Sequence, residues 1–444
     1  MAAQNTDLYK RIRAEIEGIS MVDTHEHLIS EQTRLSQKLD LFHWFSHYAS
    51  SDLVSAGLPM ASLERLRCPD LPLDERWAEF APFWKDMRNT GYGRALLLAA
   101  HDLFEVDDIN QASYRELSDK ITESNHSGWH YHVLKEQARL HLSLVDVLEN
   151  FDPCPVSEMD RRLFAPVLRV DDFVTPCNRP DLQVLERRTG VAIHSLDDLL
   201  KAMDAAFARG VRDGAPAVKV AVAYERPLLF EKVTKADAER MFNQLCRYPV
   251  TPQDNRPGEV AQLPPVSWHE ARPLHDYLMH QAIRRAIDHN LPLQVHTGLQ
   301  EGTGNLLLNS HPLQLVNLFL EYPEARFDLF HAGYPFQSEL ATLGKNFQNV
   351  YLDLCWVHVI SPWVARQTLH EWLETVPANK IFAFGGDYIF VEGAYAHSRM
   401  ARTNVAEVLA EKVSSGYLTE AEAFTLAHML LRDNAIRFFR LPAA

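Results

Sequence analysis

Two histidines one residue apart, His25 and His27, stand in the segment MVDTHEHLIS at residues 21–30. They follow a short apolar run of the kind that forms a buried strand. Because successive side chains of a strand point to opposite faces, residues i and i+2 share a face, and the two imidazoles would converge on one point. Glu26 would point to the opposite face and is not expected to be a ligand. A strand end of this kind supplies half of a metal site, so the remaining ligands must come from elsewhere in the chain.

Four further residues with metal-site chemistry lie in or just after short apolar runs: Lys219 in PAVKVAVA, His296 in LPLQVHT, His331 in RFDLFHA and Asp387 in FAFGGDY. Neutral imidazoles suit borderline divalent metals such as zinc, and a carboxylate can ligate a metal and also accept a proton. A lysine joins such a site only when burial removes its proton or when carbon dioxide converts its amine into a bridging carbamate. The alternatives are structural: Lys219 paired with an acid, and Asp387 as a turn residue after two glycines.

The elements that must position these residues are short strands alternating with amphipathic helical patterns. Near-continuous apolar strands alternating with helices are typical of a parallel sheet covered by helices. Eight strands in this arrangement predict an α/β fold of the (β/α)8 TIM barrel type, with its chemistry at the carboxyl ends of the strands. The first strand is the run before His25, and the other seven are residues 142–148, 164–170, 216–223, 291–297, 326–332, 349–355 and 380–386.

Between the first two strands, residues 31–140 are helical and rich in aromatic residues. This stretch is too long for a simple crossover, so we interpret it as a helical insertion that lies over one mouth of the barrel. His43, Trp44, His47 and the segment 128–132 could form a lid there, or they could be core residues. Other predicted elements are a helix over residues 6–18, a Pro-rich loop over 248–266, and closing helices at roughly 393–413 and 418–439.

Composition limits the class of protein. The chain has 444 residues and a formal net charge of −15, which argues against a nucleic-acid partner. Its five cysteines are scattered without CxxC spacing, which indicates reduced thiols and a cytoplasmic location. The sequence shows no signal peptide and no apolar stretch of about 18 residues that would span a membrane. We expect a single domain over residues 1–444, a small-molecule substrate and a homo-oligomer.

The segments DTHEHL, VKVAVAYERPLLF, LQVHTG, LFHAGYPF and FAFGGDY resemble the amidohydrolase superfamily. Within it, AYERPL, HAGYPF, NVYLDL and NKIFAFGGDY are similar to the FluG/nodulin-type (amidohydrolase-2-like) group, a likeness that covers roughly residues 215–412 and the first strand. The resemblance implies a metal-dependent hydrolase on a (β/α)8 barrel. It implies that His25, His27 and Asp387 bind the more buried metal, that His296 and His331 bind a second one, and that Lys219 is a carbamate bridge. We expect one or two divalent ions, zinc first, with manganese, iron or nickel as alternatives.

The expected chemistry is hydrolysis of an amide, ester, lactone or ring C–N bond by a metal-activated water. Asp387 would take the proton of this water and deliver one to the leaving group. With a single metal, His296 or His331 would polarise the carbonyl instead.

Several residues near the strand ends could contact the substrate. An arginine there could bind a substrate carboxylate in bidentate fashion, or it could form a structural ion pair. Aromatic residues there could line the pocket or pack in the core. The candidates are Arg169, Tyr224, Arg226, Trp356 and His358, and His397, Arg399 and Arg402 lie on the helix after Asp387.

Two other readings remain open. Uronate isomerase-like proteins resemble this chain in the barrel, the paired histidines, a helical insertion and an arginine after the third strand, here in FAPVLRVDDF. They do not need the lysine, so Lys219 fits them poorly, and a metal-dependent non-oxidative decarboxylase is a further possibility. A non-catalytic binding protein on a degenerate barrel would have a broken ligand set. No strand is followed by GxGxxG or GxxxxGK[ST], which disfavours a nucleotide-dependent role.

Overall fold

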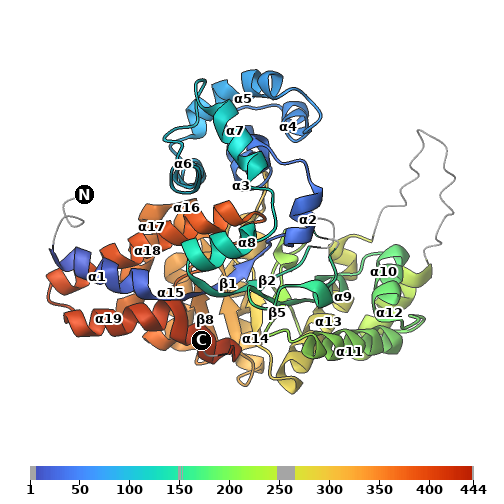
Figure 1. Cartoon of the computed structure of the whole chain (residues 1–444). Coiled ribbons are helices and arrows are strands. Elements are labelled where there is room, and N and C mark those ends of the chain that lie inside the picture. Colours follow the sequence, from blue (N-terminus) through green and yellow to red (C-terminus); the bar gives the residue numbers. More distant parts are fainter. Residues whose placement is uncertain (1–6, 149–151, 153, 248–265, 443–444) are drawn as a thin grey trace.

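The computed structural model describes residues 7–148, 152, 154–247 and 266–442. In this part of the chain the strands form two parallel sheets, with the orders β1-β2-β3 and β4-β5-β6-β7-β8-β9. Helices surround these strands, and a further group of helices lies to one side of them (Figure 1). The fold is therefore α/β with parallel strands, as predicted. The strands are β1 (Met21–Glu26), β2 (Leu140–Val145), β3 (Phe164–Pro166), β4 (Leu168–Arg169), β5 (Val218–Val220), β6 (Leu293–Val295), β7 (Phe327–Leu329), β8 (Val350–Asp353) and β9 (Ile381–Phe382).

The third predicted strand, residues 164–170, is divided between the two sheets. Its first part is β3, which pairs with β2, and its second part is β4, which pairs with β5. Between them, the Val167 N–H donates to the carbonyl of Val145 on β2 at 2.9 Å. The next N–H, that of Leu168, donates to the carbonyl of Ala217 beside β5 at 3.0 Å. One continuous run of chain therefore changes partners at its middle, which the apolar pattern alone could not show.

The strands are shorter than the apolar runs that predicted them, because the last residues of each run leave the sheet. In the run 380–386, only Ile381–Phe382 forms a strand. The Gly386 N–H donates to the carboxylate of Asp23 at 2.9 Å, so it is not available for a ladder. A Cβ at Gly386 would overlap the Glu26 carboxylate, which explains the glycine. The strand is thereby replaced by a tight loop that leads to the candidate ligand Asp387.

The interior of the six-stranded sheet carries a buried polar layer. Arg169, Lys219, Gln294 and Asp328 are in register on four neighbouring strands, β4 to β7. Lys219, Gln294 and Asp328 are at most 1% exposed. Because side chains alternate along a strand, the apolar residues that flank each of them point to the other face and pack with the surrounding helices. The polar residues therefore share one face of the sheet, the face that points away from the surrounding helices.

Between β1 and β2 the chain is helical. The first of these helices, α2, begins at Ser30, whose side chain accepts a hydrogen bond from the Thr33 N–H, and α6 begins in the same way at Thr90. In Figure 1 the helices α3 to α7 form a group apart from the helices α9 to α13. The helices of this segment, with two short turns labelled η, are α2 (Glu31–Ser36), η2 (Leu41–Phe45), α3 (Tyr48–Ser55), α4 (Met60–Leu66), α5 (Leu73–Met87), α6 (Gly91–Phe104), α7 (Tyr114–Glu123), α8 (Trp129–Tyr131) and η3 (His132–Gln137).

The helices around the strands follow the predicted alternation. They are η4 (Val156–Glu158), α9 (Asp171–Val174), α10 (Arg179–Thr189), α11 (Leu196–Arg212), η5 (Val222–Tyr224), α12 (Lys235–Arg247), α13 (Trp268–Asp288), η6 (Leu307–Ser310), η7 (Pro312–Leu315), α14 (Val316–Glu321), η8 (His331–Gly333), α15 (Gln337–Asn346), α16 (Val357–Ile360), α17 (Pro362–Thr375) and η9 (Ala378–Lys380). The loop predicted over 248–266 lies outside the described residues except for its last position.

The terminal helices agree with the expected ones. The helix predicted over residues 6–18 is α1 (Asp7–Gly18), and the one predicted at 393–413 is α18 (Val391–Ser414). The last predicted helix, 418–439, consists of α19 (Glu420–His428), the π-helical turn η10 (Met429–Asp433) and α20 (Asn434–Phe439). None of the helices in the described residues combines the length and the apolar character needed to cross a bilayer.

Candidate metal centre

A cavity of about 610 Å³ opens at the carboxyl ends of the strands. Its walls combine residues from the strand ends with residues from the helical segment between β1 and β2. Five of the six predicted ligands line it: His25, His27, Lys219, His296 and Asp387. The other lining residues are Ile29, Gln37, His43, Ser46, His47, Tyr48, Arg67, Leu148, Arg169, Ala221, Tyr224, Glu301 and Ile389.

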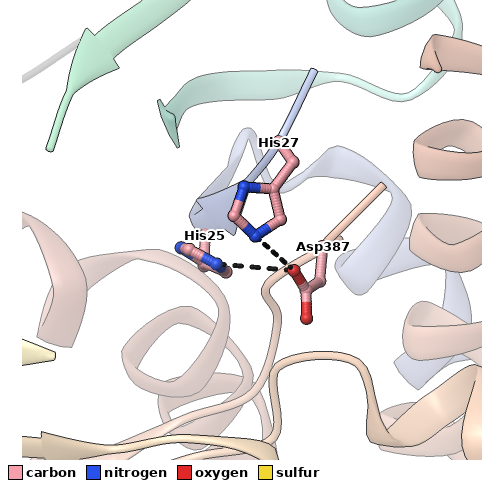
Figure 2. A group of neighbouring side chains, drawn as sticks. All are labelled: His25, His27 and Asp387. Carbon is pink, nitrogen blue, oxygen red and sulfur yellow. Dashed lines mark ion pairs between the residues drawn. The ribbon is translucent and has the colours of Figure 1, made fainter. Parts of the chain in front are cut away.

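His25, His27 and Asp387 point toward one another at one end of this cavity (Figure 2). The Nε2 atoms of both histidines lie 3.4 Å from Oδ1 of Asp387. Ligand atoms bound about 2.0–2.2 Å from one tetrahedral zinc ion lie roughly 3.3–3.6 Å apart. The spacing therefore fits three ligands of a single ion, and the three residues can hold a divalent metal.

Backbone carbonyls fix which ring nitrogen faces the cavity. The Nδ1–H of His27 donates to the carbonyl of Asp146 at 2.8 Å, which leaves the Nε2 lone pair toward Asp387. Burial lowers the pKa of His27 to about 4 and lowers that of His25 well below its usual value, so both rings are neutral near pH 7. The buried Nδ1 of His25 has no hydrogen-bond partner. Neutral imidazoles with a fixed tautomer are the form in which histidine binds metals.

His296 and His331 form a second pair of nitrogens. The Nε2–H of His296 donates to the carbonyl of Leu299 at 2.9 Å, and the Nδ1–H of His331 donates to the carbonyl of Cys355 at 3.2 Å. With both tautomers set in this way, Nδ1 of His296 and Nε2 of His331 present lone pairs to each other at 3.0 Å. Two facing lone pairs repel unless a cation lies between or beside them. His331 Nε2 is also 3.8 Å from Oδ2 of Asp387, so this pair adjoins the first group.

Lys219 lies between the two groups and is 1% exposed. Its Nζ is 3.2 Å from His25 Nε2 and 4.0 Å from the centre of the Phe330 ring. Burial lowers its pKa, although Asp146 and Asp387 act in the opposite direction. An ammonium at this place would occupy the lone pair of His25 that a metal needs. Lys219 therefore fits a metal centre only as a neutral amine or as a modified, anionic group.

Asp387 is held in an unusual backbone conformation, with φ of 62°. Its N–H donates to the carbonyl of His25 at 2.9 Å, which fixes the carboxylate relative to the first histidine. Burial raises its pKa to about 7, against the opposing effects of Lys219 and of a hydrogen bond from Tyr48. A carboxyl group that titrates near neutrality is suited to accept and return a proton.

Two of the predicted substrate residues reach the cavity. The Arg169 guanidinium is partly exposed there and contacts two carboxylates, Asp146 at 2.9 Å and Asp171 at 2.7 Å. The Tyr224 hydroxyl accepts a hydrogen bond from the Glu301 N–H at 3.0 Å, and its ring centre is 5.0 Å from that of His296.

The other three predicted substrate residues take the structural alternative. Arg226 is buried and pairs with Asp276 on α13 at 2.7 Å, so its charge is already matched inside the protein. Trp356 is buried and stacks on Tyr48, with ring centres 4.4 Å apart. His358 is buried, and its Nε2–H donates to the carbonyl of Ala383 at 2.8 Å. None of these three lines the cavity, although the Trp356 ring packs against His331.

The candidates in the helical segment also divide into two groups. His43 and His47 line the cavity. Trp44 instead stacks on Phe390, and Trp129 donates its indole N–H to Glu392 on α18, so these rings attach the segment to the rest of the protein. On α18, His397, Arg399 and Arg402 bind the Gly386 carbonyl, the Glu17 carboxylate and the Ile19 and Ala138 carbonyls, and none of them lines the cavity.

Three cavity residues with titratable side chains were not identified from the sequence: Tyr48, Arg67 and Glu301. Tyr48 follows His47 in a segment whose aromatic residues are mostly core, so its pattern gave no signal. Arg67 and Glu301 lie in polar stretches where most charged residues are solvated. Only the fold of the helical segment and of the loop after β6 brings them to the strand ends.

Comparison with known proteins identifies the chain's relatives. A family model described as amidohydrolase matches residues 255–441. Protein fluG of Emericella nidulans is 33% identical over 181 residues, which are 39% of this chain and 20% of that protein. The C-terminal part of the chain is therefore similar to amidohydrolases. The match spans about a fifth of the length of fluG, so it carries no conclusion about the activity of the whole of that protein. The likeness implies a divalent metal, and the group of His25, His27 and Asp387 could hold one.

Solved structures share the fold of this chain. A uronate isomerase from Thermotoga maritima superposes with a TM-score of 0.79 at 16% identity, and the alignment covers 97% of both chains. A glucuronate isomerase from Caulobacter crescentus gives a TM-score of 0.76 at 17% identity, covering 98% of this chain and 94% of the other. At this level of identity the likeness shows the fold alone. It extends over nearly the whole chain, including the helical segment between β1 and β2.

Proposed function

We propose that this protein is a metal-dependent hydrolase that cleaves an amide, ester, lactone or ring C–N bond in a small substrate carrying a carboxylate. The observation that best supports this proposal is a group of side chains at one set of strand ends. The group contains four neutral histidines, a buried lysine and an aspartate with a pKa near 7. We further propose that the two sheets act as one closed eight-stranded barrel in a single domain, with the helical segment 31–140 as its lid.

The proposed ligands are His25, His27 and Asp387 for one ion, and His296 and His331 for a second. A divalent ion held by these residues supplies Lewis acidity, which polarises a carbonyl group and makes water nucleophilic near neutral pH. Zinc is the first candidate because it binds imidazoles and carboxylates, and the proposed ligands of this site are closely spaced groups of that kind. The chain's own contribution is to hold these ligands neutral, oriented by backbone carbonyls and partly shielded from solvent.

Asp387 is the proposed proton carrier. Its carboxylate accepts a proton from the attacking water and returns it to the leaving nitrogen or oxygen. The Tyr48 hydrogen bond stabilises the ionised carboxylate, which keeps the raised pKa close to neutrality rather than above it. Arg169, whose charge is already paired with two carboxylates, lines the cavity and is proposed to donate a hydrogen bond that orients the substrate.

Lys219 is the proposed carbamate bridge between the two ligand groups. Its low exposure and lowered pKa favour the neutral amine, the form that reacts with carbon dioxide. The C–N bond forms as the amine attacks carbon dioxide and loses a proton, which gives an anionic carbamate. This change removes the conflict between an ammonium and a metal beside His25 Nε2.

An isomerase of the uronate type is the second candidate, favoured by the whole-chain fold likeness to the Thermotoga maritima and Caulobacter crescentus enzymes. Uronate isomerisation interconverts an aldehyde and a ketone without water, so it needs no activated nucleophile. The nearness of Lys219 to His25 and of His331 to Asp387 is better explained by the hydrolase.

The deciding experiment combines metal analysis with product analysis. The purified protein should contain one to two equivalents of a divalent metal, and a chelator should lower its melting temperature. A screen of γ-glutamyl amides, N-acyl amino acids and lactones should yield a hydrolysis product, whereas uronates should not be interconverted. Isomerised uronate without hydrolysis of any screened compound would replace the hydrolase by the isomerase, and absence of bound metal after reconstitution would reject both.

A further inference from the structure

Arg67 lies at the C-terminal end of α4 and lines the same cavity as the metal ligands. About a third of its side chain is exposed. Its Nη2 donates to the Ser46 carbonyl at 3.0 Å and to the Ser50 hydroxyl at 3.2 Å, which are neutral acceptors. The carboxylate of Glu64 is 3.5 Å from Nη1 and is itself two-thirds exposed, so it neutralises the charge weakly.

Arg169, the other cavity arginine, is in the opposite situation. Its Nη1 and Nε contact the buried carboxylates of Asp146 and Asp171 at 2.9 and 2.7 Å. Two nearby anions more than balance one guanidinium, so little net positive potential remains for a substrate anion. Of the two arginines that line the cavity in the described part of the chain, Arg67 is therefore the one whose paired carboxylate is more distant and more exposed.

The surroundings of Arg67 connect it to the metal end of the cavity. Burial lowers the pKa of His47 and raises that of Glu301; the charge of Arg67 adds to the first shift and opposes the second, so the guanidinium is close enough to act on both cavity residues. The pKa of His47 is lowered mainly by burial and also by the nearby metal ligand His27. His47 is thus close to both the ligand and the arginine. The buried Nδ1 of His47 has no hydrogen-bond partner, which leaves a polar atom for a ligand.

Arg67 also borders a second cavity, of about 240 Å³, lined by residues of the helical segment and of the turn after α4. The two cavities share four residues: Gln37, His43, Ser46 and Arg67. The buried Nε2 of His43 is without a partner as well. Arg67 therefore lies where the two cavities meet. It is not part of the buried polar layer of the six-stranded sheet.

We infer that Arg67 is the specificity-determining residue that binds a carboxylate at the end of the substrate remote from the scissile bond. This inference rests on the proposed function for the position of the scissile bond, but the binding of the carboxylate does not depend on hydrolysis. The helical segment, rather than the strand ends, then selects the substrate. A substrate with a carboxylate on this side is retained, and its neutral analogue is bound weakly because the guanidinium loses a charge-assisted hydrogen bond.

The test is calorimetric and uses the metal-loaded enzyme with linear dicarboxylic acids from malonate to pimelate and their monoamides. One carboxylate can occupy the metal end while the other reaches Arg67. At the chain length that binds best, the dicarboxylate should bind the wild-type protein about tenfold more tightly than the monoamide. Arg67→Met should reduce this ratio to about one, and Arg67→Lys should keep part of it, because lysine retains the charge without the planar fork.

Arg65→Met is the matched control. Arg65 lies on the same helix, is half exposed, pairs with Glu79 at 3.2 Å and does not line the cavity. It should leave the ratio unchanged, and metal content and melting temperature should match the wild type in all variants. An unchanged ratio in Arg67→Met, an equal loss in Arg65→Met, or no discrimination by the wild type at any length overturns the inference. If the discrimination is found but no compound is hydrolysed, the proposed function fails and the inference stands.

Discussion

At the scale of single residues, backbone carbonyls decide which ring nitrogen of the candidate ligand histidines carries the lone pair. His27, His296 and His331 each donate one ring N–H to a carbonyl, from Asp146, Leu299 and Cys355. The other nitrogen of each ring then has only its lone pair to offer. Burial keeps the rings uncharged, because a charged imidazolium would lose its hydration. The fold thus prepares the ligands before any metal binds, and Asp387 and Lys219 supply the groups that can change charge.

The role of Asp387 as a proton carrier can be tested with Asp387→Asn. The amide keeps an oxygen toward the two histidines but cannot take up a proton. We expect kcat to fall about 10²- to 10⁴-fold, the usual contribution of a positioned acid or base. The kinetic constants and the metal content of the variant should be measured together. Asp160→Asn, at an exposed aspartate paired with Arg162, is the control. Full turnover with full metal content in Asp387→Asn would remove this residue from proton transfer.

The carbamate at Lys219 makes a separate prediction. Metal-free protein reloaded with zinc in the presence of bicarbonate should gain the mass of one carbon dioxide in native mass spectrometry and should bind more metal than without bicarbonate. Lys219→Ala should show neither effect. Lys380 is an internal control, because burial lowers its pKa to about 8 while its Nζ binds backbone carbonyls far from these ligands. If modification occurs at Lys380 as well, burial alone is the cause, and the metal site has no part in it.

At the scale of elements, the helical segment between β1 and β2 is attached to the rest of the protein by a buried ion pair. Arg34 on α2 donates to the carboxylate of Glu392 on α18 at 2.8 Å, and both side chains are at most 1% exposed. Burial by itself would raise the pKa of Glu392, but Arg34 and the Trp129 indole N–H hold it below its usual value. The segment carries Tyr48 and Arg67 into the cavity, so this ion pair supports the site as well as the fold.

A double-mutant cycle tests the coupling between Arg34 and Glu392. Arg34→Met leaves a buried carboxylate unpaired, and we expect a loss of about 3–5 kcal/mol in the free energy of unfolding. Glu392→Gln should cost a similar amount, and the double variant should cost less than the sum of the two. The exposed pair of Arg11 and Glu420 is the control, and its removal should change stability little despite its good geometry. Additive losses at Arg34 and Glu392, measured by denaturant unfolding, would show that the pair is not coupled.

At the scale of the whole molecule, the sequence predicted parallel strands alternating with helices better than it predicted the cavity wall, and the ligand set stays a prediction. Short apolar runs marked the strands, and ligand types at their ends, such as His296, followed the period-two rule. The ends themselves were predicted too long, because loops such as the one before Asp387 depend on contacts with β1. Tyr48 and Arg67 reach the cavity through packing between distant helices, which no local pattern encodes. Arg226 was assigned to the rim because it follows the strand that carries Lys219. Its buried partner, Asp276, lies on a separate helix, so the local sequence did not reveal the ion pair.

The buried histidines also predict how the stability of the whole protein depends on pH. Burial lowers the pKa of His275 and of His358 to about 4, whereas the unfolded chain titrates near the usual value of about 6.5. Between these values the unfolded state binds more protons than the folded state, so stability rises with pH there. The contribution is complete above about pH 6.5 and is lost as pH falls toward 4. At pH 5 the loss amounts to about 2 kcal/mol per histidine.

This dependence can be measured on metal-free protein by denaturant unfolding between pH 4.5 and 7.5, so that the release of metal does not contribute. His358→Gln should retain a hydrogen bond to the Ala383 carbonyl, because its amide N–H₂ can replace the imidazole donor. The variant should lose less stability on acidification than the wild type does. Its unfolding should take up to one proton fewer per molecule than that of the wild type, so its stability should depend less steeply on pH. His275→Gln should behave in the same way at its contact with the Pro176 carbonyl. Curves parallel to the wild type for both variants would mean that other groups, and not these neutral histidines, set the acid limit of the fold.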